Sequence, residues 1–446
     1  MLFLPWVGSA AKARHYYIAA EDVVWDYAPS GRDLIHGIAL PAPWKEQTRW
    51  PKTRYIEYTD ATFSVRKAQP DWLGILGPII RAEVGDTVLV HFLNRSGLPH
   101  SIHPHGVRYD KDNEGAAYLP YGKGAGVAPG ERFTYRWIAD KESGPIPGGP
   151  SSVVWWYHSH VDAEKEINAG LLGAIIITAA GKADVRGAPR DVDREFVAMF
   201  MIFDELHGKD AGLFHSINGF VFGNLPGMLI KQGERVRWYL LGMGSEKDLH
   251  TPHWHGKNVF YRNRHTDVVE LLPGSMATAD MVADNPGVWL LHCHVSDHME
   301  AGMMATYTIY STAARSCPVV FAADPWERAE SSSSIRVKNL GGKPIRQVSI
   351  LSGYLVSSLE LQPLILTWFS TEPIPPGQER PVTIGKEMFA GRGNASVAFF
   401  PSRVIYEDGS EWKPRQLGDC FRIYWRDKEH PQMPVLPPFQ FQQKED

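Results

Sequence analysis

The sequence predicts an all-β protein made of three consecutive β-sandwich domains. Short runs of β-branched and aromatic residues recur along the chain, separated by turns, which is typical of sandwiches rather than of alternating helices and strands. The 446 residues include 41 Gly and 33 Pro, which supply many turns. The strands expected in the first two thirds of the chain are 87–92, 133–137, 171–178, 196–203, 235–240, 288–292 and 305–310.

Composition excludes several classes of protein. Lys and Arg total 46 against 50 Asp and Glu, and no long basic run is present, so nucleic-acid binding is not expected. The longest apolar run, 171–180, is shorter than the roughly 20 residues that cross a bilayer, so no membrane span is expected. Three Cys cannot form a disulfide scaffold. The 18 His are the informative residues.

The first two predicted domains, 12–182 and 192–312, repeat one order of motifs. Each has a His-x-His-Gly, then a Pro-Gly turn, then an aromatic strand that ends in His-x-His. The polar stretch 180–194 is the linker between them. The first copy of these motifs lies at 103–106, 129–130 and 158–160, and the second at 253–256, 273–274 and 292–294.

The third predicted domain, 328–432, resembles an immunoglobulin-like sandwich and shows no chemical motif. Its expected strands are 334–339, 347–351, 396–400, 404–406 and 421–425. Cys317 and Cys420 flank it, and they are expected either to form a disulfide that closes a loop of about 100 residues or to be two buried thiols.

Four His-x-His pairs point to a metal centre. Random placement of 18 His would give roughly 0.7 such pairs. On a strand the side-chain period is two, so both histidines of a pair face the same way and eight imidazoles can converge. The pairs are His103 with His105, His158 with His160, His253 with His255, and His292 with His294.

A second kind of metal site surrounds the only cysteine in the first two domains. His250, Cys293 and His298, with Met303 as a weak fourth ligand, make the donor set of a blue-copper electron-transfer centre. Strand alternation turns Cys293 away from the histidines on either side of it. One residue therefore links two metal sites.

These motifs resemble those of multicopper oxidases of the ceruloplasmin and laccase family, and the similarity covers about residues 15–312. The segments that carry it are 15–18, 25–27, 73–80, 102–106, 157–162 and 291–303. The resemblance implies cupredoxin-like Greek-key folds for the first two domains. It also implies four coppers per functional unit, which oxidise a donor one electron at a time and reduce O₂ to water.

The resemblance assigns a role to each ligand. It implies type 2 copper at His103 and His253, type 1 copper at His250, Cys293, His298 and Met303, and a type 3 pair at His105, His158, His160, His255, His292 and His294. The first domain departs from the type 1 pattern, because Ser159, Glu164–Glu166 and Leu171 stand where Cys, His and Met would be needed. No blue copper is expected there. Six other histidines lack a spacing partner, namely His36, His91, His100, His215, His265 and His430.

Two cupredoxin domains are fewer than the three of laccases or the six of ceruloplasmin. In those relatives the cluster lies between the first and last domains of a ring. A two-domain chain closes such a ring only with copies of itself, through head-to-tail contacts. We therefore expect a homotrimer in which the histidines of 103–160 in one subunit share each cluster with those of 253–294 in the next.

Acidic residues suggest a path for protons and the kind of electron donor. Reduction of O₂ consumes protons, and Glu114 is expected to relay them, with Asp110 and Asp112 as weaker choices. Glu205 and Asp297 favour a metal-ion donor over a phenol, as in a ferroxidase rather than a laccase. The rival hypothesis is a non-catalytic scaffold of the ceruloplasmin and coagulation-factor domain type. Small residues near Ala11 and Ala13 and the copper chemistry favour a secreted or periplasmic protein.

Overall fold

The computed structural model describes residues 12–206, 212–245, 247–310, 319–321, 333–339, 341–355, 361–384, 396–413 and 422–424. Cys317 and Cys420 lie outside these residues, so the two expectations for them stay open. The chain forms two compact units, Met1–Asn285 with Trp289–Tyr307, and Pro286–Val288 with Thr308–Asp446. The all-β prediction is confirmed, whereas the predicted domain bounds stay predictions.

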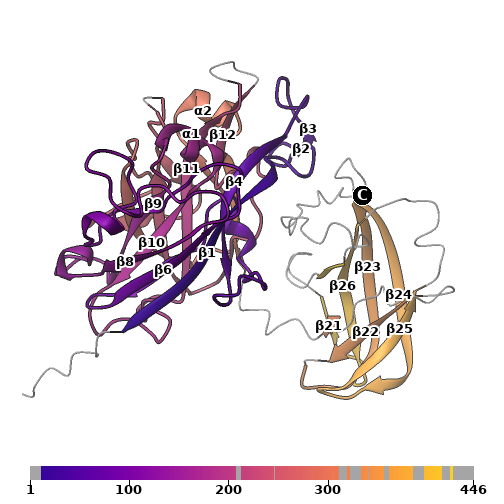
Figure 1. Ribbon diagram of the computed structural model, residues 1–446. Coiled ribbons are helices and arrows are strands. Elements are labelled where there is room, and N and C mark those ends of the chain that lie inside the picture. Colours follow the sequence, from indigo (N-terminus) through magenta and orange to yellow (C-terminus); the bar gives the residue numbers. More distant parts are fainter. Residues whose placement is uncertain are drawn as a thin grey trace, which may run out of the picture. The chain divides into compact units, whose positions relative to one another are not determined.

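The first unit begins with a sandwich of two four-stranded sheets (Figure 1). Their inward side chains form one core that contains Tyr55, Phe92, Trp137 and Tyr157, all nearly inaccessible to solvent. One sheet has the order β4 (Arg49–Tyr58), β1 (Ala13–Asp26), β6 (Thr87–Asn94), β8 (Arg132–Ile138), and the other has β5 (Ile80–Glu83), β10 (Leu172–Thr178), β9 (Ser152–His158), β7 (His103–Pro104).

A second sandwich follows in the same unit. Its six-stranded sheet has the order β12 (Leu213–Ile217), β11 (Arg194–Asp204), β14 (Arg235–Gly242), β18 (Met276–Val282), β16 (Val259–Tyr261), β17 (Arg264–Thr266). Its four-stranded sheet has the order β13 (Leu229–Lys231), β20 (Met304–Tyr310), β19 (Gly287–Cys293), β15 (Pro252–Trp254).

Strand β10 explains how the two sandwiches pack together. Ile175 and Ile177 point into the core of the first sandwich, whereas Ala174 and Ile176 join a second core that includes Met199 of β11. A strand that is covered on both faces reads as a continuous apolar run without alternation. The apolar run 171–178 is therefore explained by a strand whose two faces pack into two different cores.

Short elements position the ends of these strands. Helix α1 (Ala163–Ala169) follows β9, and α2 (Ser296–Glu300) follows β19 at the equivalent place. The remaining short elements are the hairpin β2 (Arg32–Asp33) and β3 (Ile38–Ala39), and the 3₁₀ turns η1 (Asp71–Leu73), η2 (Lys111–Asn113) and η3 (Lys141–Ser143). None of the helices in the described ranges is both long and apolar enough to cross a membrane.

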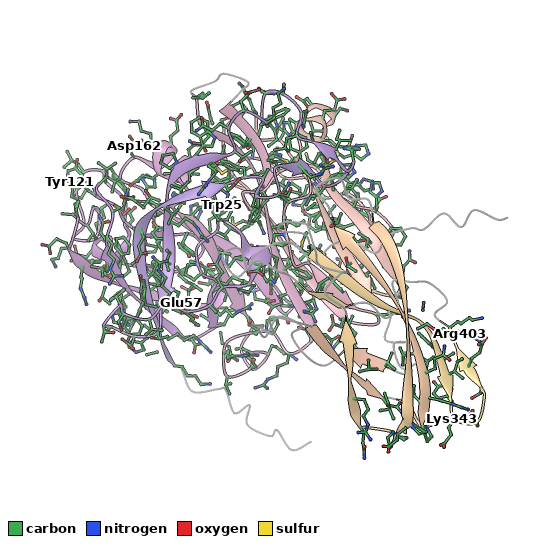
Figure 2. All side chains as sticks on the ribbon, turned by 90° about the vertical axis from the view of Figure 1, so that its right-hand side faces the viewer. Trp25, Glu57, Tyr121, Asp162, Lys343 and Arg403 are labelled. Carbon is green, nitrogen blue, oxygen red and sulfur yellow. The ribbon has the colours of Figure 1, made fainter. Side chains whose placement is uncertain are left out.

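The second unit contains two antiparallel sheets. One has the order β21 (Val319–Phe321), β22 (Ser333–Asn339), β25 (Glu379–Ile384), and the other β24 (Leu361–Ile374), β23 (Ile345–Leu355), β26 (Ser396–Tyr406), β27 (Glu411–Trp412), with β28 (Arg422–Tyr424) also on β26. Lys343 pairs with Asp408 and Arg403 with Glu411 at one end of this unit (Figure 2).

Candidate metal centres

The first four histidines lie where two strand ends meet. Strand β7 is antiparallel to β9, and their register places His103 directly opposite His158. Nε2 of His105 and Nε2 of His158 are 3.1 Å apart. The glycine of His-x-His-Gly is required here, because a Cβ on Gly106 would lie 1.9 Å from the Trp155 ring.

Backbone carbonyls fix how two of these imidazoles are oriented. Nδ1 of His103 donates to the Glu114 carbonyl over 2.7 Å, and Nδ1 of His158 donates to the Ser159 carbonyl over 2.9 Å. A carbonyl only accepts, so Nδ1 carries the hydrogen and the Nε2 lone pair is left for a metal. Burial lowers the pKa of His105 to about 4 and that of His158 to about 3, so both are neutral at pH 7.

Ring contacts bring His160 to the same place. Donor atoms of His103, His105 and His158 all lie within 4.8 Å of one another. The His160 ring centroid is 5.2 Å from that of His103 and 5.6 Å from that of His158. We call these four residues the first half-site.

The second sandwich repeats the arrangement. The register of β15 and β19 places His253 opposite His292, and Nε2 of His255 lies 3.1 Å from Nε2 of His292. Nδ1 of His292 donates to the Cys293 carbonyl over 2.8 Å, and burial lowers the pKa of His292 to about 4. The His294 ring is 5.1 Å from that of His253. These four residues form the second half-site.

The eight histidines therefore make two groups within one chain. The half-sites lie on different sheets of different sandwiches. Among the described residues, no cluster of three ligand atoms within 4.8 Å mixes histidines of the two half-sites. Within the described part of one chain, each close histidine group thus draws on one half-site, and the sharing of a cluster between subunits stays a prediction.

Cys293 lies in a buried pocket on the opposite side of β19. Its Sγ is 3.9 Å from Nδ1 of His250 and 3.7 Å from Nδ1 of His298, and all three residues are buried. Burial alone raises the pKa of the thiol, but contacts with both imidazoles outweigh it and lower the pKa to about 6. The thiolate is thus accessible near neutral pH, and the thiolate is the form that binds metals.

Met303 lies next to this pocket, and Asp248 orients the imidazole of His250. Met303 is fully buried, and the Cys293 N–H donates to the Met303 carbonyl over 3.1 Å. Nε2 of His250 lies 3.1 Å from Oδ1 of Asp248, so the other nitrogen faces the sulfur. One thiol, two imidazoles and a neighbouring thioether are the soft donors that select copper. Asp248 was missed in the sequence, where the Asp-x-His spacing was the available signal.

Glu114 contributes to the first half-site through its backbone as well as its side chain. Its carboxylate accepts hydrogen bonds from Lys111 and from the Tyr118 hydroxyl. Burial raises its pKa, but these two bonds outweigh that effect and lower it. Asp110 instead caps η2, and Asp112 pairs with Lys123 at the surface.

The two acids expected beside the type 1 site differ in exposure. Asp297 is exposed in the first turn of α2 and directly precedes His298. Glu205 is buried instead, and its carboxylate is held by the Lys52 ammonium and the Tyr27 hydroxyl. In the structure this carboxylate is therefore paired with an ammonium, and its role beside the type 1 site stays a prediction.

Two histidines that belong to no His-x-His motif lie close to other ionisable side chains in the structure. The His215 ring on β12 lies 5.0 Å from that of His298, and its Nδ1 is buried with no hydrogen-bond partner in the described residues. Nδ1 of His100 lies 2.6 Å from Oε1 of Glu166. Both contacts join segments far apart in sequence, so spacing alone does not reveal them.

Comparison with known proteins identifies the family to which the chain belongs. Family models described as "Multicopper oxidase" match residues 72–182 and 203–312. Among relatives from Homo sapiens, ferroxidase HEPHL1 is 38% identical over 337 residues, covering 66% of this chain and 29% of that protein. Hephaestin is 38% identical over 392 residues (77% and 33%), and ceruloplasmin 34% over 398 residues (81% and 36%). The chain thus spans about a third of the length of these relatives. With two matching domains, it belongs to the multicopper oxidase family.

Proposed function

We propose that this protein is a copper-dependent oxidase that couples one-electron oxidation of a donor to four-electron reduction of O₂ to water. The observation that carries the proposal is the position of Cys293 between His292 and His294. Its sulfur faces one candidate metal centre, while its two neighbours belong to the other. Copper held by these donors supplies reversible one-electron redox chemistry.

The proposed division of labour follows the donor types. His250, Cys293, His298 and Met303 hold type 1 copper, which suits a soft, buried donor set. The half-sites, which offer only imidazoles, hold one type 2 and two type 3 coppers. The total is four coppers per functional unit.

We propose that three copies of the chain assemble into a homotrimer that contains three such functional units. Each half-site has four imidazoles, too few for three coppers, and no close triad of ligand atoms among the described residues draws on both half-sites. Head-to-tail contacts that close under rotation would place the first half-site of one subunit against the second half-site of the next. The Ala117 N–H donates to the His160 carbonyl, and in the segment that follows, the apolar side chains of Leu119 and Tyr121 are 76% and 63% accessible. Such side chains suit a protein interface.

We propose a metal ion, specifically Fe(II), as the donor. The exposed carboxylate of Asp297 directly precedes His298, and Nδ1 of His215, whose ring lies 5.0 Å from that of His298, has no hydrogen-bond partner among the described residues. Oxygen and nitrogen ligands suit a divalent cation. One curated relative is named a ferroxidase. A phenol is the competing donor, and it needs no carboxylate at this position.

Glu114 is proposed to pass protons toward the first half-site. Its backbone carbonyl accepts from Nδ1 of His103, which places Glu114 beside the first half-site, and its lowered pKa means that a proton it has taken up is released readily. The Tyr118 hydroxyl donates a hydrogen bond to Glu114, and because Tyr118 is exposed it extends the path toward solvent.

Steady-state assays with Fe(II) and with a phenolic dye, each monitored by O₂ consumption, test the proposal. We expect turnover on both and a higher kcat/KM for Fe(II). A copper-replete protein that consumes no O₂ with either donor would instead support the non-catalytic scaffold. The proposed location, secreted or periplasmic, follows from the copper chemistry and is tested by fractionating the cells that express the protein.

A further inference from the structure

The first sandwich contains a buried cluster of residues that corresponds in position to the Cys293 pocket. His100 precedes His103 by three positions, as His250 precedes His253, and Ser159 lies between two histidines, as Cys293 does. The Ser159 N–H donates to the Leu171 carbonyl over 3.0 Å, and the Cys293 N–H donates to the Met303 carbonyl over 3.1 Å. Leu171 and Met303 each follow a glycine with positive φ. The Leu171 N–H donates to the Glu166 carbonyl, and the Met303 N–H donates to the His298 carbonyl, both over 3.0 Å, so Glu166 occupies the place of His298.

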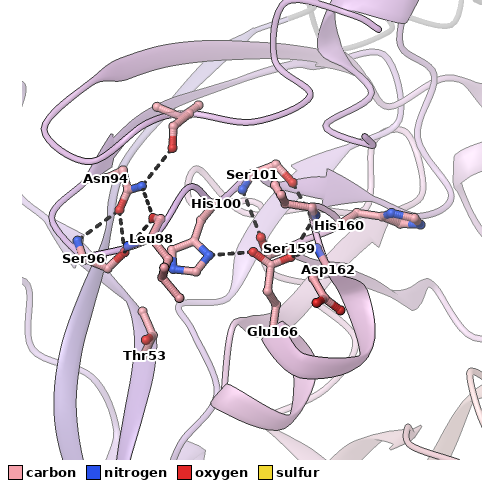
Figure 3. Close-up of polar contacts among 12 residues, drawn as sticks. Thr53, Asn94, Ser96, Leu98, His100, Ser101, Ser159, His160, Asp162 and Glu166 are labelled. Atoms are coloured by element: carbon pink, nitrogen blue, oxygen red, sulfur yellow. Dashed lines mark hydrogen bonds and ion pairs between the residues drawn. The ribbon is translucent and has the colours of Figure 1, made fainter. Parts of the chain in front are cut away.

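Glu166 fills this pocket with hydrogen bonds. Its side chain is buried, and Oε1 lies 2.6 Å from Nδ1 of His100. Oε2 accepts the N–H groups of Val161 over 2.8 Å and Asp162 over 2.9 Å (Figure 3). Because a carboxylate only accepts, Nδ1 of His100 must carry the hydrogen. The bonds from His100, Asp162 and Ser159 outweigh burial and lower the pKa of Glu166.

A second set of bonds joins the same segments through Ser101. The Ser101 N–H donates to Oγ of Ser159, and Oγ of Ser101 accepts the N–H of His160, both over 2.9 Å. The same hydroxyl donates to the Gly115 carbonyl over 2.6 Å. In Figure 3 the imidazole of His160 points away from this network, so the main chain is held while the ring is free to bind.

We propose that Glu166, paired with His100, is a positioning residue for the copper cluster: it replaces a metal ion as the group that ties the His103 segment to the His158–His160 segment. The inference rests on the proposed function. A buried anion with three donors keeps the first half-site arranged whether or not copper is bound. Outer groups that orient ligands typically change metal affinity or activity by about 10- to 100-fold when removed.

The test compares Glu166→Gln with Glu164→Gln, which makes the same change at an exposed position of the same helix. Type 2 and type 3 copper are quantified by EPR and metal analysis, and the blue absorption of the type 1 centre reports on the second sandwich in the same sample. We expect Glu166→Gln to weaken cluster copper binding about 10- to 100-fold with the blue absorption retained. Glu164→Gln should behave as wild type. Full cluster occupancy in Glu166→Gln would overturn the proposal.

Hydrogen exchange of the metal-free protein separates this proposal from the proposed function. The amides of Val161 and Asp162 should exchange slowly in wild type and at least tenfold faster in Glu166→Gln and in His100→Phe. Unchanged exchange in both variants would overturn the proposed positioning role of Glu166, even if the protein binds copper. Wild-type protein that shows this protection but binds no copper would instead contradict the proposed function.

Discussion

His292 and Cys293 are neighbours on β19 whose side chains serve different centres. Nε2 of His292 lies 3.1 Å from Nε2 of His255, whereas Sγ of Cys293 lies 3.7 Å from Nδ1 of His298 on the other side of the strand. The period of two in a β-strand produces this separation. The covalent route between the proposed type 1 copper and the proposed cluster therefore runs through two adjacent residues and crosses one peptide bond.

The trimer predicts complementation between inactive variants. His105→Ala disables the first half-site and His255→Ala the second, so each homotrimer should lose O₂ reduction. In an equal mixture, a cluster is intact only when a His255→Ala chain supplies its first half-site and a His105→Ala chain supplies its second. Each condition is met half of the time, so about one quarter of wild-type activity should return. O₂ consumption of the co-expressed mixture measures this fraction.

A matched mixture provides the control for this experiment. His105→Ala and His158→Ala both damage the first half-site, so their mixture should stay inactive. Equal activity in the two mixtures, or no recovery in the first, would rule out clusters shared between subunits.

Asp297 is predicted to favour a cationic donor. Asp297→Asn removes an exposed charge next to His298, and we expect KM for Fe(II) to rise about two- to fivefold, the range for single exposed charges. The effect should shrink at high salt, because ions screen surface charges. Glu300→Gln, an exposed carboxylate on the same helix, and a phenolic donor are the controls. An equal change with both donors would argue against a cation site.

The lowered histidine pKa values predict how the metal-free protein responds to pH. His105 and His158 titrate near pH 4 and pH 3 when folded, against 6.5 in the unfolded chain. Between these values the unfolded chain binds more protons, so the free energy of unfolding rises with pH. This stability is present above about pH 6.5 and is lost as the pH falls toward 4.

Urea titrations of the metal-free protein check this prediction. His105→Gln, whose amide does not titrate, should lose less stability than wild type between pH 6.5 and pH 4.5. Parallel stability curves for the two proteins would show that His105 has no shifted pKa.

The buried Lys52–Glu205 pair predicts a structural effect. Lys52→Met removes the cation and leaves a buried carboxylate uncompensated, which typically costs about 3–5 kcal/mol. The double variant Lys52→Met/Glu205→Leu should recover most of that loss, and Lys45→Met, at an exposed pair, should be neutral. Chemical denaturation measures all three. If Lys52→Met were as stable as wild type, the ion pair would not support the fold.

The sequence was most informative where the fold repeats a short pattern. The expected strands from 87–92 to 305–310 match β6, β8, β10, β11, β14, β19 and β20 within two residues, because each combines apolar patterning with a flanking turn. Strands β1 and β4 were missed, and β4 carries Pro51 on a sheet edge, where proline is tolerated but weakens the strand pattern. The long strand β24 was also missed, and the segments 396–400 and 404–406 are one strand, β26.

For the candidate sites too, local spacings could be read from the sequence, whereas contacts between distant segments could not. His-x-His and His-Cys-His are local spacings, so the residues that the structure brings together in the three clusters were visible in the sequence. The pairs His100–Glu166, His215–His298 and Lys52–Glu205 join strands or helices far apart in the chain, and only the fold reveals them. Lys52 lies 153 positions before Glu205, so the sequence gives no sign that these two side chains form a pair.

Copper content of metal-replete protein, measured together with visible and EPR spectra in wild type and in Cys293→Ser, tests the central claim most directly. We predict about four coppers per chain in wild type, and about three in Cys293→Ser, with the blue absorption gone and turnover at background. Wild-type protein without stoichiometric copper, or a Cys293→Ser variant that keeps its blue colour and full turnover, would contradict the account.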